Sequence, residues 1–538
     1  MKYFLPKRII KYNGNIENIE NLCIKKTLQI GLYEPIVTHI VGNGYVILDF
    51  GEEICGGIRI LTQSVKGEAR MRIRFGESIT ETCANLGEKN ATNDHSIRDL
   101  TVDLPKYSDI TLGQTGFRFI RLNFISGEFK IKSILAASNE EEREYIGGFI
   151  SDDDLLNRIW NTAAKTLSLC VRNGYIWDGI KRDRLVWIGD IYPEAKAAYA
   201  LYGNIPEIKN SLEFCRDQTP DGAWMNGFPT YSAWWIINLC EYYFQSGDKE
   251  FVIKNSDFIE RIVNQIANCI DESGNVNFPF YFIDWATNYT QSNNETQKDL
   301  IKKHEEAAGT NYLLRITFKK VIPLLQDFGL DSKVATNAME RLCKKSYTVK
   351  EYKQIAALGV YAGEITEENK KVMLNGGAKG LTTFLNYFIF GALDKFGEHG
   401  EVIEMIKEYY GKMISLGATT FWEDFDITWA ENAYGIDELP VKGKKDIHGD
   451  YGRFCYTGYR HSLCHGWSSG VLAYMSEYIL GVEKVSENKY SVKPNLIGLN
   501  KLKGTYPTPF GKIEIYAERQ KNGEISINIT APKGITII

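Results

Sequence analysis

A fourteen-residue stretch, from Trp177 to Asp190, concentrates side chains that could do chemistry together. It contains three aspartates, three basic residues, two tryptophans and two glycines. A carboxylic acid beside an aromatic wall and arginines offers a proton source, a surface on which a sugar ring can stack, and donors for sugar hydroxyls. The same composition is also typical of an ion-paired helix start around a buried tryptophan, so composition alone leaves both interpretations open.

The local pattern predicts how these side chains are presented. Gly179 marks a turn after Trp177 and Asp178. From Arg182 onward the stretch is expected to enter a helix. A helix there would bring Asp183, Trp187 and Asp190 to one face at positions i, i+4 and i+7.

Later segments of the chain again place acids or a histidine beside aromatic residues, in predicted loops between helices. One such pair alone is more often a hydrogen-bonded core contact than a site. Several of them become a candidate site if one end of a ring of helices gathers the loops. The segments supply Trp235 in Phe228–Trp235, Asp284 with Trp285, Trp422 with Glu423, and His465 at a helix start.

The bulk composition restricts the class of protein. A chain of 538 residues suggests two to four domains, and a net charge of −5 with interspersed basic residues argues against nucleic-acid binding. No apolar leader is visible, and no apolar run is long enough to span a membrane. Ten cysteines without a Cys-x-x-Cys pair are typical of reduced thiols in a cytoplasmic protein. No residue set has metal-ligand spacing, so we expect neither metal nor cofactor.

Residue periodicity divides the chain into three parts. Residues 1–145 contain short apolar runs, and Glu68–Phe75 alternates apolar and charged residues as a half-buried strand does. Residues 146–480 begin with the helix-start signal Ser151-Asp-Asp-Asp and contain roughly ten to twelve helix-like segments. Residues 481–538 return to strand alternation, with the isoleucines of Lys512–Glu518 and Glu524–Thr530 facing inward. The predicted architecture is a helical solenoid or closed toroid between two β-sandwiches.

The motifs also carry a family resemblance that covers nearly the whole chain. The segments Asp178–Asp190, Phe228–Trp234, Gly417–Glu423 and Ser462–His465 together resemble the bacterial α-L-rhamnosidases of glycoside hydrolase family 78. The resemblance implies an (α/α)6 six-hairpin catalytic domain over 146–480, a β-sandwich over 1–145 before it and a second one over 481–538 after it. It also implies an inverting glycoside hydrolase.

Carried over residue by residue, the resemblance implies two catalytic carboxyl groups. Asp183 stands where the family has a glutamate as general acid, one methylene shorter, and Glu423 matches the general base. His465 matches a sugar-binding histidine, while Cys464 replaces the asparagine that precedes it in the family. The substrate-binding residues expected from the motifs are Asp178, Arg182, Trp187, Asp190, Trp235, Asp284, Trp285, Trp422 and His465.

The reaction implied is release of a terminal α-L-rhamnose, or a related sugar, from an oligosaccharide or glycoside. In an inverting enzyme one carboxylic acid protonates the leaving oxygen, and a carboxylate opposite activates water. Two alternatives stay open. A six-hairpin enzyme could act on another sugar or as a polysaccharide lyase with Tyr231 or His465 as base, and the shortened acid could mark an inactive carbohydrate-binding protein. The partner expected is a carbohydrate, and a homodimer is compatible with the sequence.

Overall fold

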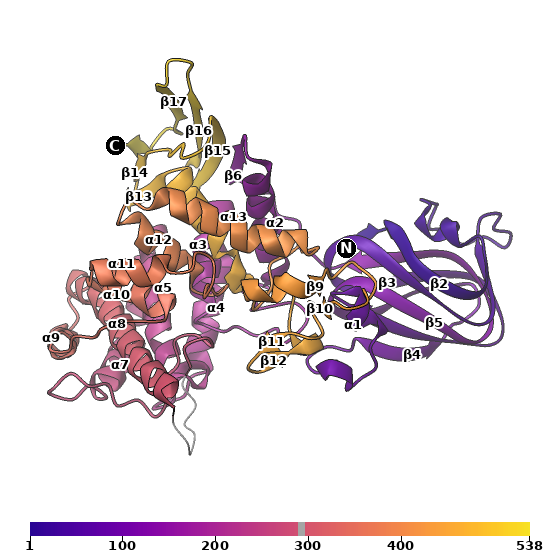
Figure 1. The fold of residues 1–538 in the computed structure, drawn as a ribbon, viewed down its shortest axis with the longest axis horizontal. Helices are drawn as coiled ribbons and strands as arrows, with labels where there is room; N and C mark the ends of the chain where they lie inside the picture. Colours follow the sequence, from indigo (N-terminus) through magenta and orange to yellow (C-terminus); the bar gives the residue numbers. More distant parts are fainter. Residues whose placement is uncertain (289–295) are drawn as a thin grey trace.

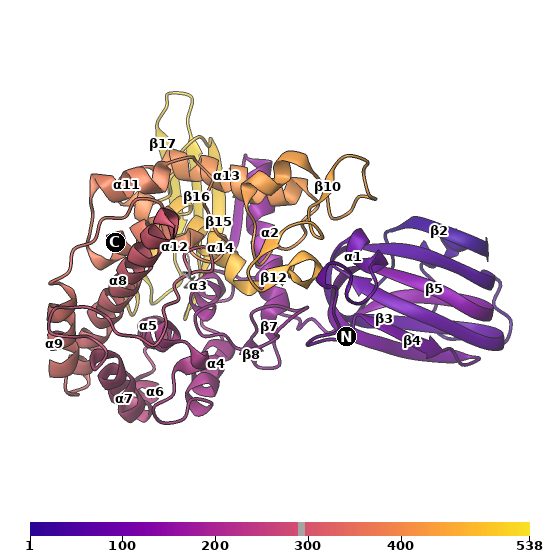
Figure 2. The same cartoon turned by 60° about the horizontal axis from the view of Figure 1, so that its bottom comes forward.

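The computed structural model of the protein describes residues 1–288 and 296–538. Figures 1 and 2 show an N-terminal β region to one side of a helical region, with the C-terminal strands packed against another side of the helices. This arrangement confirms the coarse prediction of a helical region flanked by sheets.

Two long, bent strands organise the N-terminal region. β3 (Thr38–Gly76) and β5 (Ser108–Ser138) pair antiparallel over most of their length, with several shifts of register. The predicted alternation is confirmed for the apolar face, because every second side chain from Ala69 to Phe75 is buried. On the other face Arg70 is exposed and Arg72 half-buried, but Arg74 is buried, which the alternation did not predict. The sheet also contains β1 (Lys2–Phe4), β2 (Arg8–Glu17) and β4 (Asp99–Asp103), in the order β1-β5-β3-β2 with β4 paired to β3, and α1 (Ile79–Cys83) follows β3.

Six helices of the helical region contact one another in a closed cycle, each touching the next and the last touching the first. Except for the charged first part of α8, they are buried on nearly all sides, as the helices inside a protein are. In cyclic order they are α3 (Ile191–Leu201), α5 (Pro229–Ser246), α8 (Gln297–Asp327), α10 (Lys353–Ala362), α12 (Asn386–Asp394) and α14 (Gly470–Tyr474).

Further helices alternate with these along the chain, and each contacts a member of the cycle. They are one-sided: α7, for example, buries Ile259, Ile262, Val263 and Ile266, which repeat at helical spacing, and exposes its other face. This second set comprises α2 (Asp154–Cys170), α4 (Pro206–Asp217), α7 (Ser256–Ala267), α9 (Lys333–Leu342), α11 (Glu367–Leu374) and α13 (His399–Ser415), with the short α6 (Lys249–Lys254) before α7.

The C-terminal region contains two small sheets, and one of them recruits a strand from the start of the helical region. β6 (Gly148–Ser151) pairs with β15 (Lys501–Thr508), as both views show. The alternation predicted for β16 (Gly511–Arg519) is confirmed. In β17 (Ile525–Thr530) Ile529 packs partly buried against the core, but Ile525 and Ile527 do not point inward as expected. Ile525 and Ile527 are 42% and 48% exposed because β17 is an edge strand. The second sheet holds β13 (Val482–Ser486), β14 (Lys489–Val492) and β18 (Thr536–Ile537).

Long connections before α3 and before α14 carry most of the polar residues singled out in the sequence. Residues 177–190 follow β8 (Tyr175–Ile176), and residues 416–469 separate α13 from α14 with only short elements. Among the described residues, no helix combines the length and apolar character needed to cross a membrane. The second connection contains β9 (Ala433–Tyr434), β10 (Lys445–Asp446), β11 (Gly452–Arg453) and β12 (Tyr456–Thr457).

Candidate active site

The stretch 177–190 is a closed loop, so the predicted helix from Arg182 is wrong. The backbone N–H of Asp178 donates to the Leu185 carbonyl at 3.0 Å, and the Leu185 N–H donates to Asp178 Oδ1 at 2.8 Å. Between them Asp183 and Arg184 adopt left-handed backbone, with φ of 54° and 59°. These contacts close the loop at its base, and α3 starts only at Ile191.

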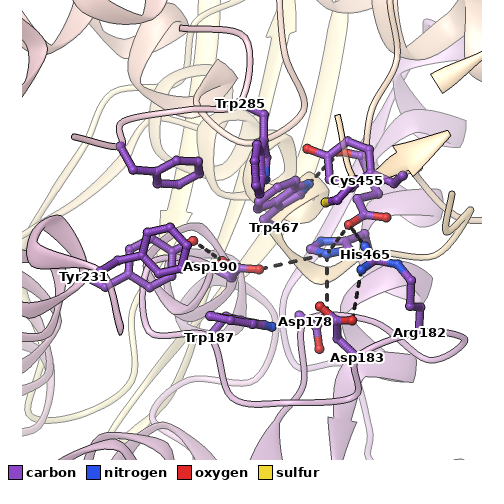
Figure 3. Close-up of a pocket in the computed structure, with 14 residues that line it drawn as sticks. Asp178, Arg182, Asp183, Trp187, Asp190, Tyr231, Trp285, Cys455, His465 and Trp467 are labelled. Carbon is purple, nitrogen blue, oxygen red and sulfur yellow. Dashed lines mark hydrogen bonds and ion pairs between the residues drawn. The ribbon is translucent and has the colours of Figure 1, made fainter. Parts of the chain in front are cut away.

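The loop forms one wall of a pocket of about 390 Å³. Although the helix is absent, Asp183, Trp187 and Asp190 do line the same pocket. Figure 3 shows Trp187 on one side of it and Trp285 with Trp467 on the other. The lining residues are Asp178, Arg182, Asp183, Trp187, Asp190, Phe228, Tyr231, Phe282, Trp285, Glu423, Cys455, Tyr456, His465 and Trp467.

One guanidinium holds the two carboxyl groups expected to be catalytic. Arg182 Nη1 donates to Asp183 Oδ1 at 2.9 Å, and Arg182 Nη2 donates to Glu423 Oε1. The guanidinium of Arg182 thus contacts both carboxyl groups at once. Burial raises the pKa of Glu423, and the charge of Arg182 opposes that rise.

The segment that follows β12 fixes Glu423 from both its backbone and its side chain. The Glu423 N–H donates to the Ser462 carbonyl at 3.0 Å, and the Ser462 N–H donates to Glu423 Oε2 at 3.2 Å. Trp467 Nε1 donates to the Glu423 carbonyl at 2.9 Å. Each oxygen of this carboxyl group therefore accepts one hydrogen bond, Oε1 from Arg182 and Oε2 from the Ser462 N–H, while the Glu423 backbone is held separately.

A histidine lies among three acids at the base of the pocket. His465 Nε2 is 3.6 Å from Glu423 Oε1, 3.7 Å from Asp178 Oδ2 and 4.0 Å from Asp190 Oδ2. Burial lowers the pKa of His465 well below its ordinary value, with a further contribution from Arg182. The imidazole is therefore neutral at neutral pH and can donate a hydrogen bond to an acid or accept one from a sugar hydroxyl.

Asp178 and Asp190 differ from Glu423 in lacking a cation of their own. Burial raises the pKa of each well above its ordinary range. For Asp178 the neighbouring carboxylates Asp183 and Asp190 add to the rise, and for Asp190 the hydroxyl of Tyr231, which donates at 3.1 Å, opposes it. Both acids are thus able to remain protonated and donate hydrogen bonds to sugar oxygens.

Three of the predicted substrate-binding residues do not line the pocket. Trp235 is wholly buried in the helical core, where Nε1 donates to the Leu212 carbonyl at 3.0 Å. Trp422 is buried against Phe425 with its back to the pocket. Asp284 lies behind Trp285 and accepts from Thr382 Oγ1 at 2.6 Å, and burial raises its pKa to about 6. Their assignment as sugar contacts is corrected, because each packs within the core.

Six lining residues were not predicted as sugar contacts. Phe228 and Tyr231 belong to the segment from which Trp235 was chosen, and Phe282 and Trp467 lie two or three residues from a predicted site residue. Cys455 and Tyr456 come from the connection before α14, whose sequence there carries no pattern. A search of the residues flanking each motif would have found four of the six.

A second acidic cluster lies beside the loop, where the N-terminal region meets the helical region. Glu77, Glu81 and His448 are buried, and their ligand atoms lie within 4.8 Å of one another, close enough to hold a metal ion. The ammonium of Lys181, however, lies 2.9 Å from Glu77 Oε2 and 3.3 Å from Glu81 Oε1. Lys181 supplies the positive charge that these carboxylates need, and the cluster joins the two regions.

Comparison with known proteins places part of the chain in a family. Residues 144–314 match the model described as the bacterial alpha-L-rhamnosidase 6 hairpin glycosidase domain. The match covers about a third of the chain, and this region is similar to that family. The resemblance drawn from the motifs is confirmed, and the six-hairpin domain match contains the whole 177–190 loop. Glu423 and His465 lie beyond the matched residues. No curated protein sequence matches the chain.

Solved structures extend the likeness over nearly the whole chain. The GH78 family rhamnosidase of Bacillus sp. GL1 is 19% identical with a TM-score of 0.77, covering 97% of this chain and 55% of its own. The rhamnosidase from Klebsiella oxytoca with rhamnose bound is 19% identical with a TM-score of 0.66, covering 89% of this chain and 95% of its own. These likenesses establish the fold. The chain spans a little over half the length of the Bacillus enzyme.

Proposed function

We propose that this chain is an inverting exo-glycoside hydrolase that releases a terminal α-L-rhamnose or a related sugar. The observation that carries the proposal is the pair of carboxyl groups, Asp183 and Glu423, on the two ends of the Arg182 guanidinium in an aromatic-walled pocket. The proposal includes an (α/α)6 toroid over residues 146–480, which the cycle of six helices supports, and β-sandwiches over 1–145 and 481–538. The predicted cytoplasmic location and homodimer stay predictions.

The proposed mechanism gives each carboxyl group one role. Asp183 protonates the leaving oxygen, while Glu423, as the carboxylate, takes a proton from the water that attacks the other face of the sugar. Inverting enzymes keep their carboxyl groups roughly 6.5–9.5 Å apart to make room for that water, and retaining enzymes keep them about 5–5.5 Å apart. Arg182, which donates to both carboxyl groups, holds them in the same pocket.

The remaining polar groups suit the binding of a neutral sugar. Asp178, Asp190 and His465 are buried and carry no cation of their own, so their neutral forms are favoured. They offer both donors and acceptors to ring hydroxyls. The tryptophans on the two sides of the pocket can cover the apolar faces of the ring.

The first experiment is a screen of aryl glycosides that includes an α-L-rhamnoside, with the anomer of the released sugar followed by NMR. We expect cleavage of the rhamnoside, with the β-anomer appearing first. Early appearance of the α-anomer would refute inversion. Absence of cleavage across the panel would favour the carbohydrate-binding alternative, and an unsaturated product would favour a lyase.

The structure gives a reason to prefer hydrolysis to the lyase alternative. A lyase that used Tyr231 as its base would need this hydroxyl to ionise, yet burial raises the pKa of Tyr231 well above the ordinary value and the neighbouring Asp190 raises it further. The Tyr231 hydroxyl also donates its proton to Asp190. Tyr231 is therefore better suited to orient Asp190 than to act as a base.

Asp183→Asn separates proton donation from binding. We expect kcat/KM for an alkyl rhamnoside to fall by about 10²–10⁴-fold, because its alkoxide leaves poorly without a proton. An activated dinitrophenyl rhamnoside, whose leaving group needs little protonation, should lose about tenfold or less. Steady-state kinetics on the two substrates measure the difference, and an equal loss on both would assign Asp183 to positioning.

Arg182→Gln tests whether this guanidinium keeps the base ionised. Arg182 lowers the pKa of Glu423, so its removal should raise that pKa. An opposite charge at such a distance shifts a pKa by about 1–3 units. Since the base must be deprotonated, the acidic limb of the kcat/KM profile should move to higher pH by that amount.

Arg184→Gln provides the matched control for this pH profile. It removes the same charge two residues along the loop, but the Arg184 guanidinium stacks on Trp177 at 4.9 Å and does not line the pocket. We expect the acidic limb of the kcat/KM profile of Arg184→Gln to lie at the same pH as in the unmodified protein. Equal shifts in the two variants would mean that overall loop charge, rather than the contact with Glu423, sets the profile.

A further inference from the structure

The N-terminal β region reaches the catalytic loop through one histidine. His95 lies in the connection between α1 and β4, and its Nε2 is 3.5 Å from Asp183 Oδ1. His95 does not line the pocket, so it meets the acid from outside. Its side chain is one-third exposed, whereas that of Asp183 is 18% exposed.

The segment around His95 is fixed against the catalytic loop on both sides of the ring. Ser96 Oγ donates to the Lys181 carbonyl at 2.8 Å, two residues before Asp183. On the other side, Asp94 is paired with Arg460 at 2.6 Å, which ties it to the turn before the Glu423-binding segment. These two anchors hold the imidazole against the Asp183 carboxyl group without help from the ring itself.

Both partners of the contact have an uncommon backbone conformation. His95 has φ of 65° and Asp183 has φ of 54°, in the left-handed region that residues other than glycine seldom adopt. Such conformations persist where surrounding contacts impose them, and they gather at functional sites. Here the anchors at Asp94 and Ser96, and the base of the 178–185 loop, impose the conformations that bring the two side chains together.

The contacts of Asp183 distinguish its two oxygens. Arg182 Nη1 and His95 Nε2 both approach Oδ1, so that oxygen is engaged from two directions. The carboxyl proton is then carried by Oδ2. On the proposed mechanism, Oδ2 gives this proton to the leaving oxygen as the glycosidic C–O bond breaks and its electron pair moves to that oxygen. The charge left on Asp183 is shared with Oδ1, where both donors lie.

We propose that His95 is a positioning residue for the general acid, holding Asp183 so that Oδ2 faces the leaving group. The inference rests on the proposed function and deepens it. Arg182 alone would draw Asp183 toward Glu423, since the same guanidinium binds both. His95 contacts the same oxygen from the N-terminal region, at 3.5 Å, and resists that rotation. The charged groups that face the ring are Asp183, Asp94 and, through Asp94, Arg460.

The test uses His95→Ala and His95→Gln in the full chain, assayed on an alkyl and a dinitrophenyl rhamnoside across pH. We expect His95→Ala to lower kcat on the alkyl substrate by about 10–100-fold with KM within about twofold, because a displaced catalytic group costs up to about 10²-fold. The dinitrophenyl substrate should change by less than about threefold. His95→Gln, which keeps a polar side chain at the same place, should recover most of the loss.

Two comparisons separate the role of His95 from a structural effect. In an Asp183→Asn background, His95→Ala should cause no further loss, because it acts through the acid. His39→Ala is the matched control: His39 also pairs with carboxylates, at 3.2 Å from Glu17 and 3.1 Å from Glu128, but on the N-terminal sheet. It should leave both substrates unaffected.

Each alternative outcome has a distinct meaning. An unmodified protein that cleaves neither substrate refutes the proposed function, and the role of His95 with it. An active protein in which His95→Ala changes neither substrate, lowers both equally, or adds to the loss from Asp183→Asn refutes the role of His95 alone.

Discussion

Glu423→Gln is expected to lower kcat by about 10²–10⁴-fold on every substrate that the unmodified protein cleaves, because removal of a general base costs that much. Unlike Asp183→Asn, the loss should not depend on the leaving group, since the attacking water needs the base in each case. Glutamine keeps the size of the side chain and one acceptor for the Ser462 N–H. Sugar binding, measured by calorimetry with L-rhamnose, should weaken by less than about tenfold.

Asp426→Asn provides the control for the same change of acid to amide. Asp426 lies three residues along the chain, contacts Arg453 at 3.3 Å and does not line the pocket. We expect near-normal turnover from this variant. Near-normal turnover from Glu423→Gln would show that the base is another group, and loss of binding together with turnover would show that Glu423 mainly holds the sugar.

Lys181→Met is expected to give the largest loss of stability. It removes the cation between Glu77 and Glu81, and its Nζ also donates to the Tyr459 and His461 carbonyls. Deleting one member of a buried ion pair costs about 3–5 kcal/mol, because the charge left behind has no partner. The loss in free energy of unfolding is measured by denaturant titration. The transition to follow is the one in which the interface between the N-terminal and helical regions opens.

The pH dependence of this loss has a definite sign. Burial raises the pKa of Glu77 to about 7, and Lys181 opposes the rise, so the pKa of Glu77 goes higher still without Lys181. A group whose pKa is raised on folding is stabilising when protonated, and that stability is lost as pH rises. The deficit of Lys181→Met relative to the unmodified protein should therefore be smallest below about pH 7, where Glu77 is protonated in both folded proteins, and grow as the pH rises above that value.

Lys89→Met tests whether burial, rather than the number of ion pairs, sets the size of this effect. Lys89 joins the same two regions through Asp450 at 2.7 Å, but its side chain is 45% exposed. An exposed pair is worth about 0–1 kcal/mol. Equal losses from the two variants would contradict a special role for the buried cluster.

The order of the β and helical regions could be predicted from the sequence because each kind of region has its own residue periodicity. The alternation at residues 69–75 describes one face of one strand, and the burial of that apolar face is confirmed. The edge position of β17 was not visible, because exposure of Ile525 and Ile527 depends on whether another strand pairs beside them.

The site could be predicted only where a motif marked it. Eight of the predicted residues line the pocket. Trp235 does not, because the sequence near a helix start is the same for a tryptophan that faces a pocket and for one that faces the core. The helix from Arg182 failed because hydrogen bonds between Asp178 and Leu185 close a loop there, and helical spacing cannot reveal such a pairing. His95 was missed because 88 residues separate it from Asp183.

The adjacent residues Lys181 and Arg182 bear on how this architecture can change in evolution. Lys181 is held by carboxylates of the N-terminal region, and Arg182 by the two proposed catalytic acids. A single peptide bond thus joins the residue that contacts the N-terminal region, Lys181, to the residue that contacts the two proposed catalytic acids, Arg182. The N-terminal region cannot be exchanged by recombination as an independent module, because any replacement must preserve partners for Lys181. Substitutions on the two sides of this boundary are therefore expected to arise together rather than one at a time.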